Sequence, residues 1–320
     1  MSDVLISENI AGAEMDVLRA NFDCTFAPDL WKHPDELHAM IGNYKALMVR
    51  NQTQVTRELI AAATNLQIIG RAGVGLDNVD LQAATDHGIV VALTPEQNAN
   101  SVAELTIGLI LALARKIPAA DCDTKAGGWK RQHFTGIEIL GKKLGVVGFG
   151  RIGVSTANKA RALGMDIVAY DPFVDAESLK AMEARATMTS LENVLQQADF
   201  VSCHLPAMKS TVHLFDESKF ALMKSSAYFI NTSRGEVVSE EALIRALQDH
   251  KIAGAALDVR STEPPEDSVL ATMDNVILLP HIGAFTTEGQ IRVVTAICKD
   301  VAAVLDGNAA KNFANFSKPK

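Results

Sequence analysis

Short apolar runs rich in β-branched residues alternate with segments of helical periodicity along almost the whole chain. This alternation is typical of parallel β-sheets whose strands are joined by helices. In the first third, helices are expected around residues 14–20, 57–63 and 81–86. Strands are expected in the same third at 3–7, 45–51, 66–72 and 89–93.

A second series of strands and helices begins near residue 143 and ends in a helix over about 287–305. Its strands are expected at 143–149, 166–171, 200–206, 227–233, 252–259 and 275–282. We therefore predict an α/β protein of two lobes, in which a doubly wound parallel-sheet domain over 98–287 is inserted into a domain formed by 1–97 and 288–320. A cleft between two lobes is a common place for a small-ligand site.

The segment from Ser101 to Arg115 predicts a helix that is buried on nearly every face. Ser101 and Glu104 fit a capping box at its start. The sequence that follows, LTIGLILALAR, is apolar almost throughout. Such a helix is expected to pack between the lobes or against a second subunit.

Composition excludes several classes of function. The 320 residues carry a net charge of -8, which disfavours non-specific binding to nucleic acid or to anionic membranes. No apolar run approaches the ~18 residues that span a bilayer, and the first residues do not resemble a signal peptide. The four cysteines form no CxxC pair, so we expect free thiols in a reducing cytoplasm, and no metal site.

A glycine-rich turn follows the strand expected at 143–149. Gly148, Gly150 and Gly153 form the GxGxxG pattern, which allows a tight turn, close approach of a pyrophosphate and close helix–strand packing. Asp171 ends the next strand, where a carboxylate would bind the ribose hydroxyls of the adenosine. It would repel a 2′-phosphate, so the sequence favours NAD over NADP.

Three polar residues follow expected strands of the second lobe: Arg234, Glu263 and His281. Each alone could be an ordinary surface charge or a satisfied strand-end histidine. Together they suit the interconversion of a 2-hydroxy acid and a 2-keto acid. Histidine can carry the proton of the C2 oxygen, a carboxylate can favour the imidazolium, and arginine can clamp the substrate carboxylate.

Several motifs at matching intervals resemble the NAD-dependent D-2-hydroxyacid dehydrogenase family. They are GRAGVGLDNVD (70–80), NSVAELTIGLILALAR (100–115), LGVVGFGRIG (144–153), INTSRGEVV (230–238) and PHIGA (280–284). The resemblance covers nearly the whole chain. It implies an inserted Rossmann domain within a flavodoxin-like substrate domain, a homodimer, NAD as cofactor and D-stereospecific hydride transfer. The family's catalytic residues correspond to Arg234, Glu263 and His281.

The resemblance also implies finer roles. Backbone N–H groups of Val74 and Gly75 would bind the substrate carboxylate, and Asp258 would hold the nicotinamide carboxamide. The full set of residues expected along the cofactor is Gly148, Gly150, Arg151, Ile152, Gly153, Asp171, His204, Pro206, Thr211, Thr232, Asp258 and Gly283.

Within the family, the motifs are most similar to the 3-phosphoglycerate dehydrogenases. That similarity implies arginines that receive a distal phosphate. The substrate-binding set is then Arg50, Asn51, Arg71, Val74 and Gly75, with Arg131 contributed by a neighbouring subunit. The same arginines could instead form ordinary salt bridges, or bind a substrate carrying a sulfonate or a second carboxylate.

Two residues depart from the family pattern: Arg260, where an aromatic residue is usual, and Phe285, where a small hydroxyl residue is common. An extra cation and a bulky ring near the site could signal a different acid. The chain has no extension for the regulatory domain of many phosphoglycerate dehydrogenases, so feedback inhibition through one is not expected. The alternatives are a glyoxylate or hydroxypyruvate reductase, a sulfolactate-type dehydrogenase and an NAD-sensing corepressor.

Overall fold

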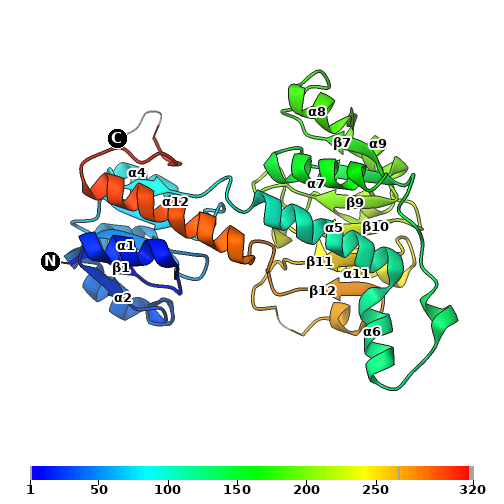
Figure 1. Ribbon diagram of the computed structural model, residues 1–320, viewed down its shortest axis with the longest axis horizontal. Coiled ribbons are helices and arrows are strands. Elements are labelled where there is room, and N and C mark those ends of the chain that lie inside the picture. Colours follow the sequence, from blue (N-terminus) through cyan, green and yellow to red (C-terminus); the bar gives the residue numbers. More distant parts are fainter. Residues whose placement is uncertain (1, 266, 317–320) are drawn as a thin grey trace. The chain divides into compact units, whose positions relative to one another are not determined.

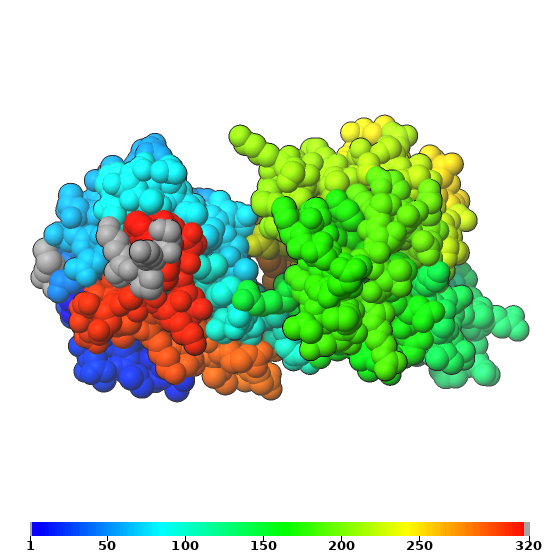
Figure 2. All heavy atoms as spheres, turned by 90° about the horizontal axis from the view of Figure 1, so that it is seen from above, coloured from blue at the N-terminus to red at the C-terminus, as the bar shows by residue number. Residues whose placement is uncertain are grey.

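The computed structural model describes residues 2–265 and 267–316, which form two compact units. One unit comprises the residues up to Asn98 together with those from Phe285 onward, and the other comprises Ala99–Ala284. Both ends of the chain therefore belong to the first unit. The orange-red C-terminal segment packs among blue and cyan N-terminal residues there (Figures 1 and 2).

The first unit contains a five-stranded parallel sheet in the order β2-β1-β3-β4-β5. Its strands are β1 (Ser2–Ile6), β2 (Cys24–Phe26), β3 (Tyr44–Val49), β4 (Ile68–Arg71) and β5 (Val90–Ala92). This is the flavodoxin-like order, in which the connections reverse direction at β1 and β3. Ligands of such sheets bind at the carboxyl ends of the strands near that reversal.

Alternating side chains of this sheet supply two hydrophobic layers, because successive residues of a strand point to opposite faces. Leu5, Leu47 and Ile69 face one layer, and Val4 and Ala46 face the other. The first layer is covered by α2 (Pro34–Met40), α3 (Arg57–Ala62) and α4 (Leu81–Asp86). The second is covered by α1 (Ala13–Asn21) and α12 (Thr287–Leu305).

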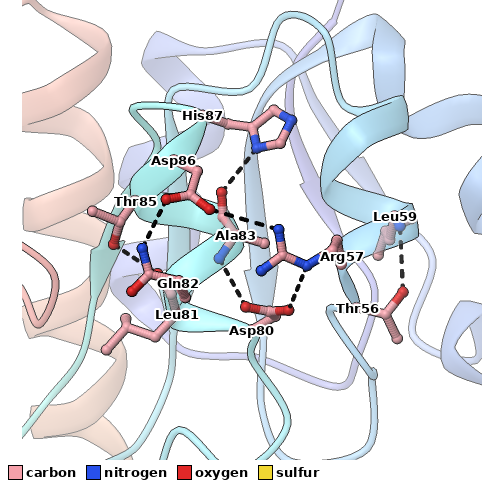
Figure 3. A network of polar contacts seen from close by, with 10 residues as sticks. All are labelled: Thr56, Arg57, Leu59, Asp80, Leu81, Gln82, Ala83, Thr85, Asp86 and His87. Carbon is pink, nitrogen blue, oxygen red and sulfur yellow. Dashed lines mark hydrogen bonds and ion pairs between the residues drawn. The ribbon is translucent and has the colours of Figure 1, made fainter.

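A polar network joins α3 and α4 (Figure 3). The Arg57 guanidinium lies 3.4 Å from Asp80 and 3.6 Å from Asp86. Asp80 also caps α4 by accepting the Ala83 N–H at 2.7 Å, and Thr56 caps α3 through the Leu59 N–H. These contacts fix the start of α4, which follows the loop after β4.

The second unit contains a seven-stranded parallel sheet in the order β12-β11-β10-β9-β6-β7-β8. Its strands are β6 (Lys143–Val147), β7 (Asp166–Tyr170), β8 (Thr187–Met188), β9 (Phe200–Cys203), β10 (Tyr228–Asn231), β11 (Gly254–Leu257) and β12 (Val276–Leu278). Strand order reverses between β6 and β9, which is the switch point of a Rossmann sheet, with one further strand at the β12 edge.

Helices cover both faces of this sheet. The layer around Val146, Phe200 and Ile230 includes residues of three helices, and α5 and α7 pack side by side on it (Figure 1). These helices are α5 (Ala99–Arg115), α7 (Arg151–Ala162) and α8 (Leu179–Ala184). The opposite layer is formed with α9 (Leu191–Gln197), α10 (Glu217–Phe220) and α11 (Glu240–Gln248). The remaining helix, α6 (Ile117–Lys125), has no buried residue.

The predicted fold class, two α/β units with parallel sheets, is confirmed. Sequence periodicity gave no range for the edge strands β2 and β8, nor for the helices α2, α6 and α8 to α11. The capping box was wrong. Helix α5 begins at Ala99, so Ser101 lies buried inside its first turn, and Glu104 instead accepts the Asn100 side-chain amide at 2.7 Å.

Within this chain, helix α5 is buried along part of its surface. Val102, Leu109 and Leu113 lie in the core, whereas Asn100, Glu104 and Gly108 are exposed. No helix among the described residues combines the length and apolarity that crossing a bilayer requires.

Helix α7 packs unusually close to the turn that precedes it. A Cβ on Gly153 would lie 2.1 Å from the Gly148 carbonyl oxygen and 3.1 Å from Val146 Cγ1. Any larger residue would push α7 away from β6.

We expect Gly153→Ala to lower the free energy of unfolding by about 1–3 kcal/mol, the usual cost of overpacking. Gly108→Ala is the control, because Gly108 is helical and a Cβ there would have no neighbouring atom within 4 Å. It should gain about 0.5–1 kcal/mol from helix propensity. Urea denaturation measures both, and equal stability of Gly153→Ala and the wild type would contradict the packing argument.

Candidate active site

The carboxyl ends of three adjacent strands gather the residues that sequence reasoning selected in the second unit. Arg234 follows β10, Glu263 lies in the loop after β11, and His281 follows β12. These strands are neighbours in the sheet and run parallel. Their ends therefore meet at one edge, as an open α/β sheet requires of a ligand site.

His281 and Glu263 form the central contact. The His281 Nδ1 lies 2.7 Å from Glu263 Oε2. The other carboxylate oxygen, Oε1, accepts the Arg260 backbone N–H at 3.1 Å. Burial raises the pKa of Glu263, but the hydrogen bond and charge of His281, the Arg260 N–H and the charge of Arg234 together hold it below its usual value. Glu263 is therefore an ionised partner for the imidazole.

His281 adopts an unusual backbone conformation, with φ of 56°. Left-handed backbone is uncommon outside glycine and persists where the surrounding contacts determine it. Asp258 supplies those contacts. Its carbonyl accepts the His281 N–H at 2.8 Å, and its carboxylate accepts the N–H groups of Ile282 (2.8 Å) and Gly283 (2.7 Å).

Asp258 is 1% exposed, and burial raises its pKa although the two N–H groups oppose the shift. The sequence assigned Asp258 and Gly283 to the cofactor. In the structure they bind each other, and the Gly283 N–H is already donated. The structure therefore gives Asp258 a direct role in shaping the turn that carries His281.

Arg234 is held by its own segment. Its Nη1 donates to the Ser233 carbonyl at 2.7 Å, and its carbonyl accepts the Asn231 side-chain amide at 2.8 Å. The guanidinium is half-buried, and its charge reaches Glu263. Arginine, carboxylate and imidazole thus follow three neighbouring strands at one edge of the sheet.

The glycine turn after β6 has the geometry of a pyrophosphate cradle. Gly148 has φ of 93°, and a Cβ there would lie 2.8 Å from the His204 carbonyl oxygen. Gly150 faces open space, since a Cβ there would meet no atom within 4 Å. Helix α7 begins at Arg151, so the backbone of Arg151 and Ile152 forms its positive N-terminal end beside that space. These residues fit a bound dinucleotide.

Asp171 lies directly after β7 and is tied to the glycine turn. Its carboxylate accepts the N–H groups of Phe149 (2.8 Å) and Phe173 (2.9 Å). Each oxygen retains a lone pair, so the side chain keeps acceptor capacity for ribose hydroxyls.

The remaining predicted cofactor residues lie on the loops after β9 and β10. His204 contacts Ser202 Oγ through Nε2 at 2.8 Å, and burial lowers its pKa to about 3, so it is neutral near pH 7. Thr211 donates to the Pro206 carbonyl at 2.6 Å and holds that loop. The Thr232 hydroxyl contacts that of Thr106 on α5 at 3.0 Å.

In the first unit, the loop after β3 carries Arg50 and the exposed Asn51. The Arg50 guanidinium lies over the Phe285 ring, 4.9 Å from its centroid. Its Nη2 donates to Gln290 Oε1 at 2.6 Å. Burial lowers the pKa of Arg50, and the charge of Glu8 opposes this shift.

Sequence reasoning missed the two residues that hold this loop. Glu8 is 2% exposed and accepts the N–H groups of Arg50 (2.8 Å), Thr53 (2.9 Å) and Gln52 (3.2 Å). Asn78 donates to the carbonyls of Arg50 and Thr53. The sequence did contain a signal for Glu8, because it is a charged residue directly after the apolar strand expected at 3–7.

The other predicted substrate residues of the first unit follow β4. Arg71 lies over Gly73, where a Cβ would come 1.5 Å from Arg71 Nη1. Val74 and Gly75 follow in the same loop, and no backbone acceptor among the described residues binds their N–H groups. Arg131, by contrast, lies exposed in the second unit, in a short 3-10 helix at Arg131–Phe134.

The suspected extra cation near the site, Arg260, is not free. Its Nε and Nη2 donate to the two oxygens of Glu240 at 2.9 and 2.5 Å, and its side chain is 9% exposed. The charge of Arg260 is therefore neutralised inside the unit by Glu240. The other departure from the family pattern, Phe285, is 58% exposed, and the Arg50 guanidinium lies over its ring.

The four cysteines are free thiols. Within residues 2–265 and 267–316, no group of three His, Cys, Asp or Glu side chains has the arrangement of a metal site.

Comparison with known proteins identifies the family. Residues 107–283 match the family described as D-isomer specific 2-hydroxyacid dehydrogenase, NAD binding domain. The chain is 41% identical over 316 residues to a D-3-phosphoglycerate dehydrogenase of Methanocaldococcus jannaschii, covering 99% of this chain but 60% of that protein. The chain belongs to the D-isomer specific 2-hydroxyacid dehydrogenase family, and its second unit contains the family's NAD-binding domain.

Solved structures are also similar over their full lengths. A glyoxylate reductase from Paecilomyes thermophila has a TM-score of 0.89 and 29% identity, with 99% of both chains covered. A D-lactate dehydrogenase from Aquifex aeolicus, complexed with NAD and lactic acid, has a TM-score of 0.87 and 29% identity, covering 99% of this chain and 100% of that one.

The lowered pKa of Glu263 predicts a pH dependence of stability. Because its folded-state pKa lies below the unfolded value of about 4.3, ionised Glu263 stabilises the fold above that pH. The contribution is lost as the pH falls through the folded-state pKa. The stability difference between wild type and Glu263→Gln should therefore shrink on acidification from about pH 7 to below about 4.3. Urea denaturation across this range measures it, with Glu241→Gln as control. A difference independent of pH would contradict it.

Proposed function

We propose that this protein interconverts a D-2-hydroxy acid and its 2-keto acid by hydride transfer with NAD. The observation that carries the proposal is the 2.7 Å contact between His281 and Glu263. Arg234 follows a neighbouring strand, and its charge contributes to the lowered pKa of Glu263. This cluster lies at the carboxyl edge of the sheet whose glycine turn fits a dinucleotide.

The three side chains divide the work. NADH, when bound, supplies the hydride to C2 of the keto acid. Glu263 accepts from His281 Nδ1, which leaves Nε2 to give the proton to the C2 oxygen. The ionised Glu263 stabilises the imidazolium before transfer. Arg234 offers a planar fork of donors to the substrate carboxylate and polarises the carbonyl.

The first unit is proposed to bind the rest of the acid. The N–H groups of Val74 and Gly75 would bind its carboxylate, and Arg50, Asn51 and Arg71 its distal group. Arg50 uses part of its guanidinium on Asn9 and Gln290 and has five N–H donors in all, so donors remain for an anion.

We infer 3-phosphoglycerate and 3-phosphohydroxypyruvate as the best substrate pair, supported by the named relative and by the ordered Arg50. The alternatives are glyoxylate or hydroxypyruvate, as in the named glyoxylate reductase, and a sulfolactate-type acid. This chain spans about 60% of the length of the phosphoglycerate dehydrogenase relative, so that relative's activity comes to this chain only as a proposal.

We further infer a homodimer that works in the cytoplasm. The segment after α5 exposes large apolar side chains, with Ile117, Trp129 and Leu140 exposed by 52%, 78% and 72%. Such residues are typical of a surface covered by a partner. Arg131 lies in the same segment and would reach the substrate of the neighbouring subunit. Free cysteines suit a reducing compartment.

The first test removes the proton donor. His281→Asn should lower turnover of keto-acid reduction by about 10²–10⁴-fold, the usual worth of general acid catalysis, with the NADH dissociation constant nearly unchanged. In the wild type, turnover should fall as the pH rises, because the imidazolium supplies the proton. Steady-state kinetics and NADH fluorescence titration measure these values. Near-wild-type turnover by the variant would place the acid elsewhere.

The second test identifies the acid. Rates with phosphohydroxypyruvate, hydroxypyruvate, glyoxylate and sulfopyruvate are compared with NADH and with NADPH. Arg50→Gln should raise KM for phosphohydroxypyruvate by about tenfold or more, since it removes a charged hydrogen bond worth about 1.5–3 kcal/mol. KM for glyoxylate, which has no distal group, is the control. Equal wild-type efficiency on the two acids would remove the case for a phosphate site, and NADH binding without turnover of any acid would favour the corepressor alternative.

A further inference from the structure

The loop that carries Glu263 has no helix or strand to hold it. Its described residues, 260–265 and 267–268, lie between β11 and a short 3-10 helix at Val269–Thr272. A carboxylate that orients an imidazole must be held to within a fraction of an ångström, because small displacements of catalytic groups are costly. Something other than secondary structure must therefore position Glu263.

Both ends of this loop are bound to one carboxylate, that of Glu240 in the first turn of α11. At the start of the loop, Arg260 makes its two-pronged contact with Glu240 Oε1 and Oε2. At the end, Ser268 Oγ donates to Glu240 Oε1 at 3.0 Å. The Arg260 side chain is 9% exposed and that of Glu240 28%, so water competes weakly for the pair.

The anchored residue is the one that binds Glu263. The Arg260 backbone N–H donates to Glu263 Oε1, while its own side chain is fixed on Glu240. The position of the donor therefore depends on the ion pair. A chain of contacts runs from Glu240 through Arg260 and Glu263 to His281.

The same pair joins the Glu263 loop to the segment that carries Arg234. Gly235 follows Arg234, and a Cβ there would lie 2.0 Å from the Arg260 carbonyl carbon and 2.3 Å from the Ser261 nitrogen. The two backbones are thus in direct contact. Glu240 lies a few residues after Gly235, in the first turn of α11. Its ion pair with Arg260 is therefore a second contact between the Arg234 segment and the Glu263 loop.

We propose that Glu240 and Arg260 are positioning residues for the active site, acting through the Arg260 backbone to hold Glu263 against His281 and in register with Arg234. The inference rests on the proposed function for its catalytic consequence. The ion pair performs this anchoring by charge and hydrogen bonds.

The test uses Glu240→Gln, with Glu241→Gln as a matched control. Glu241 is the next residue on α11, and its partner Arg245 forms an exposed pair at 3.3 Å. Glu240→Gln should reduce turnover of keto-acid reduction by about tenfold or more and move the fall of its pH profile to lower pH. The NADH dissociation constant should stay unchanged. Arg260→Lys, which keeps the charge but loses the fork, should give an intermediate loss.

A second readout needs no activity. The His281 Nδ1 proton, held in the bond to Glu263, should give a downfield proton NMR signal in the wild type and in Glu241→Gln. Glu263→Gln should remove it, and Glu240→Gln should weaken or shift it. Should Glu240→Gln not fold, Ser268→Ala releases one end of the loop without leaving a buried charge unpaired. A smaller change in the same direction is then expected.

The outcomes separate the two proposals. A wild type inactive on every keto acid would overturn the proposed function, while the NMR signal would still test the anchoring. Folded Glu240→Gln and Arg260→Lys variants with the wild-type NMR signal, turnover and pH profile would overturn the positioning role. A lowered melting temperature with all three unchanged would also overturn it, because the pair would then serve stability only.

Discussion

The contact between His281 Nδ1 and Glu263 Oε2 is the interaction on which the proposed chemistry depends. It leaves Nε2 as the imidazole nitrogen without this partner, and it places a carboxylate beside the ring. Neither residue could make it alone. His281 is turned toward Glu263 by a left-handed backbone that Asp258 holds through three backbone N–H groups, and Glu263 is held by the backbone of Arg260.

In the first unit, a buried carboxylate likewise holds a loop by accepting its backbone N–H groups. Glu8 accepts three N–H groups of the loop after β3, as Asp258 does for the turn after β12 through its carboxylate and carbonyl. In both units the carboxylate is almost inaccessible to water, which strengthens its hydrogen bonds and makes an unpaired donor costly. In each sheet, a buried acid thus holds the backbone of a loop that carries a predicted site residue. Glu8 does so for Arg50, and Asp258 does so for His281.

The two departures from the family pattern have different physical meanings. Arg260 is largely buried and is neutralised by Glu240 within its own unit. Phe285 is exposed and supports the guanidinium of Arg50 through its ring face, where cation–π attraction favours one orientation. The sequence pattern did not indicate the partner of Arg260, because Glu240 lies 20 residues away on another element.

The sequence by itself determined the fold class, the GxGxxG turn and the family, because strand and helix periodicity and glycine geometry are local properties. It also selected Arg234, Glu263 and His281, since residues that end parallel strands share one edge. Only the tertiary structure decided what holds them. The hydrogen bonds of Glu8, Asp258 and Glu240 join residues distant in the chain, and α5 begins at Ala99 with Ser101 buried in its first turn. The pattern of neighbouring residues in the sequence does not indicate such partners, because burial and hydrogen-bond geometry arise only once the elements have packed.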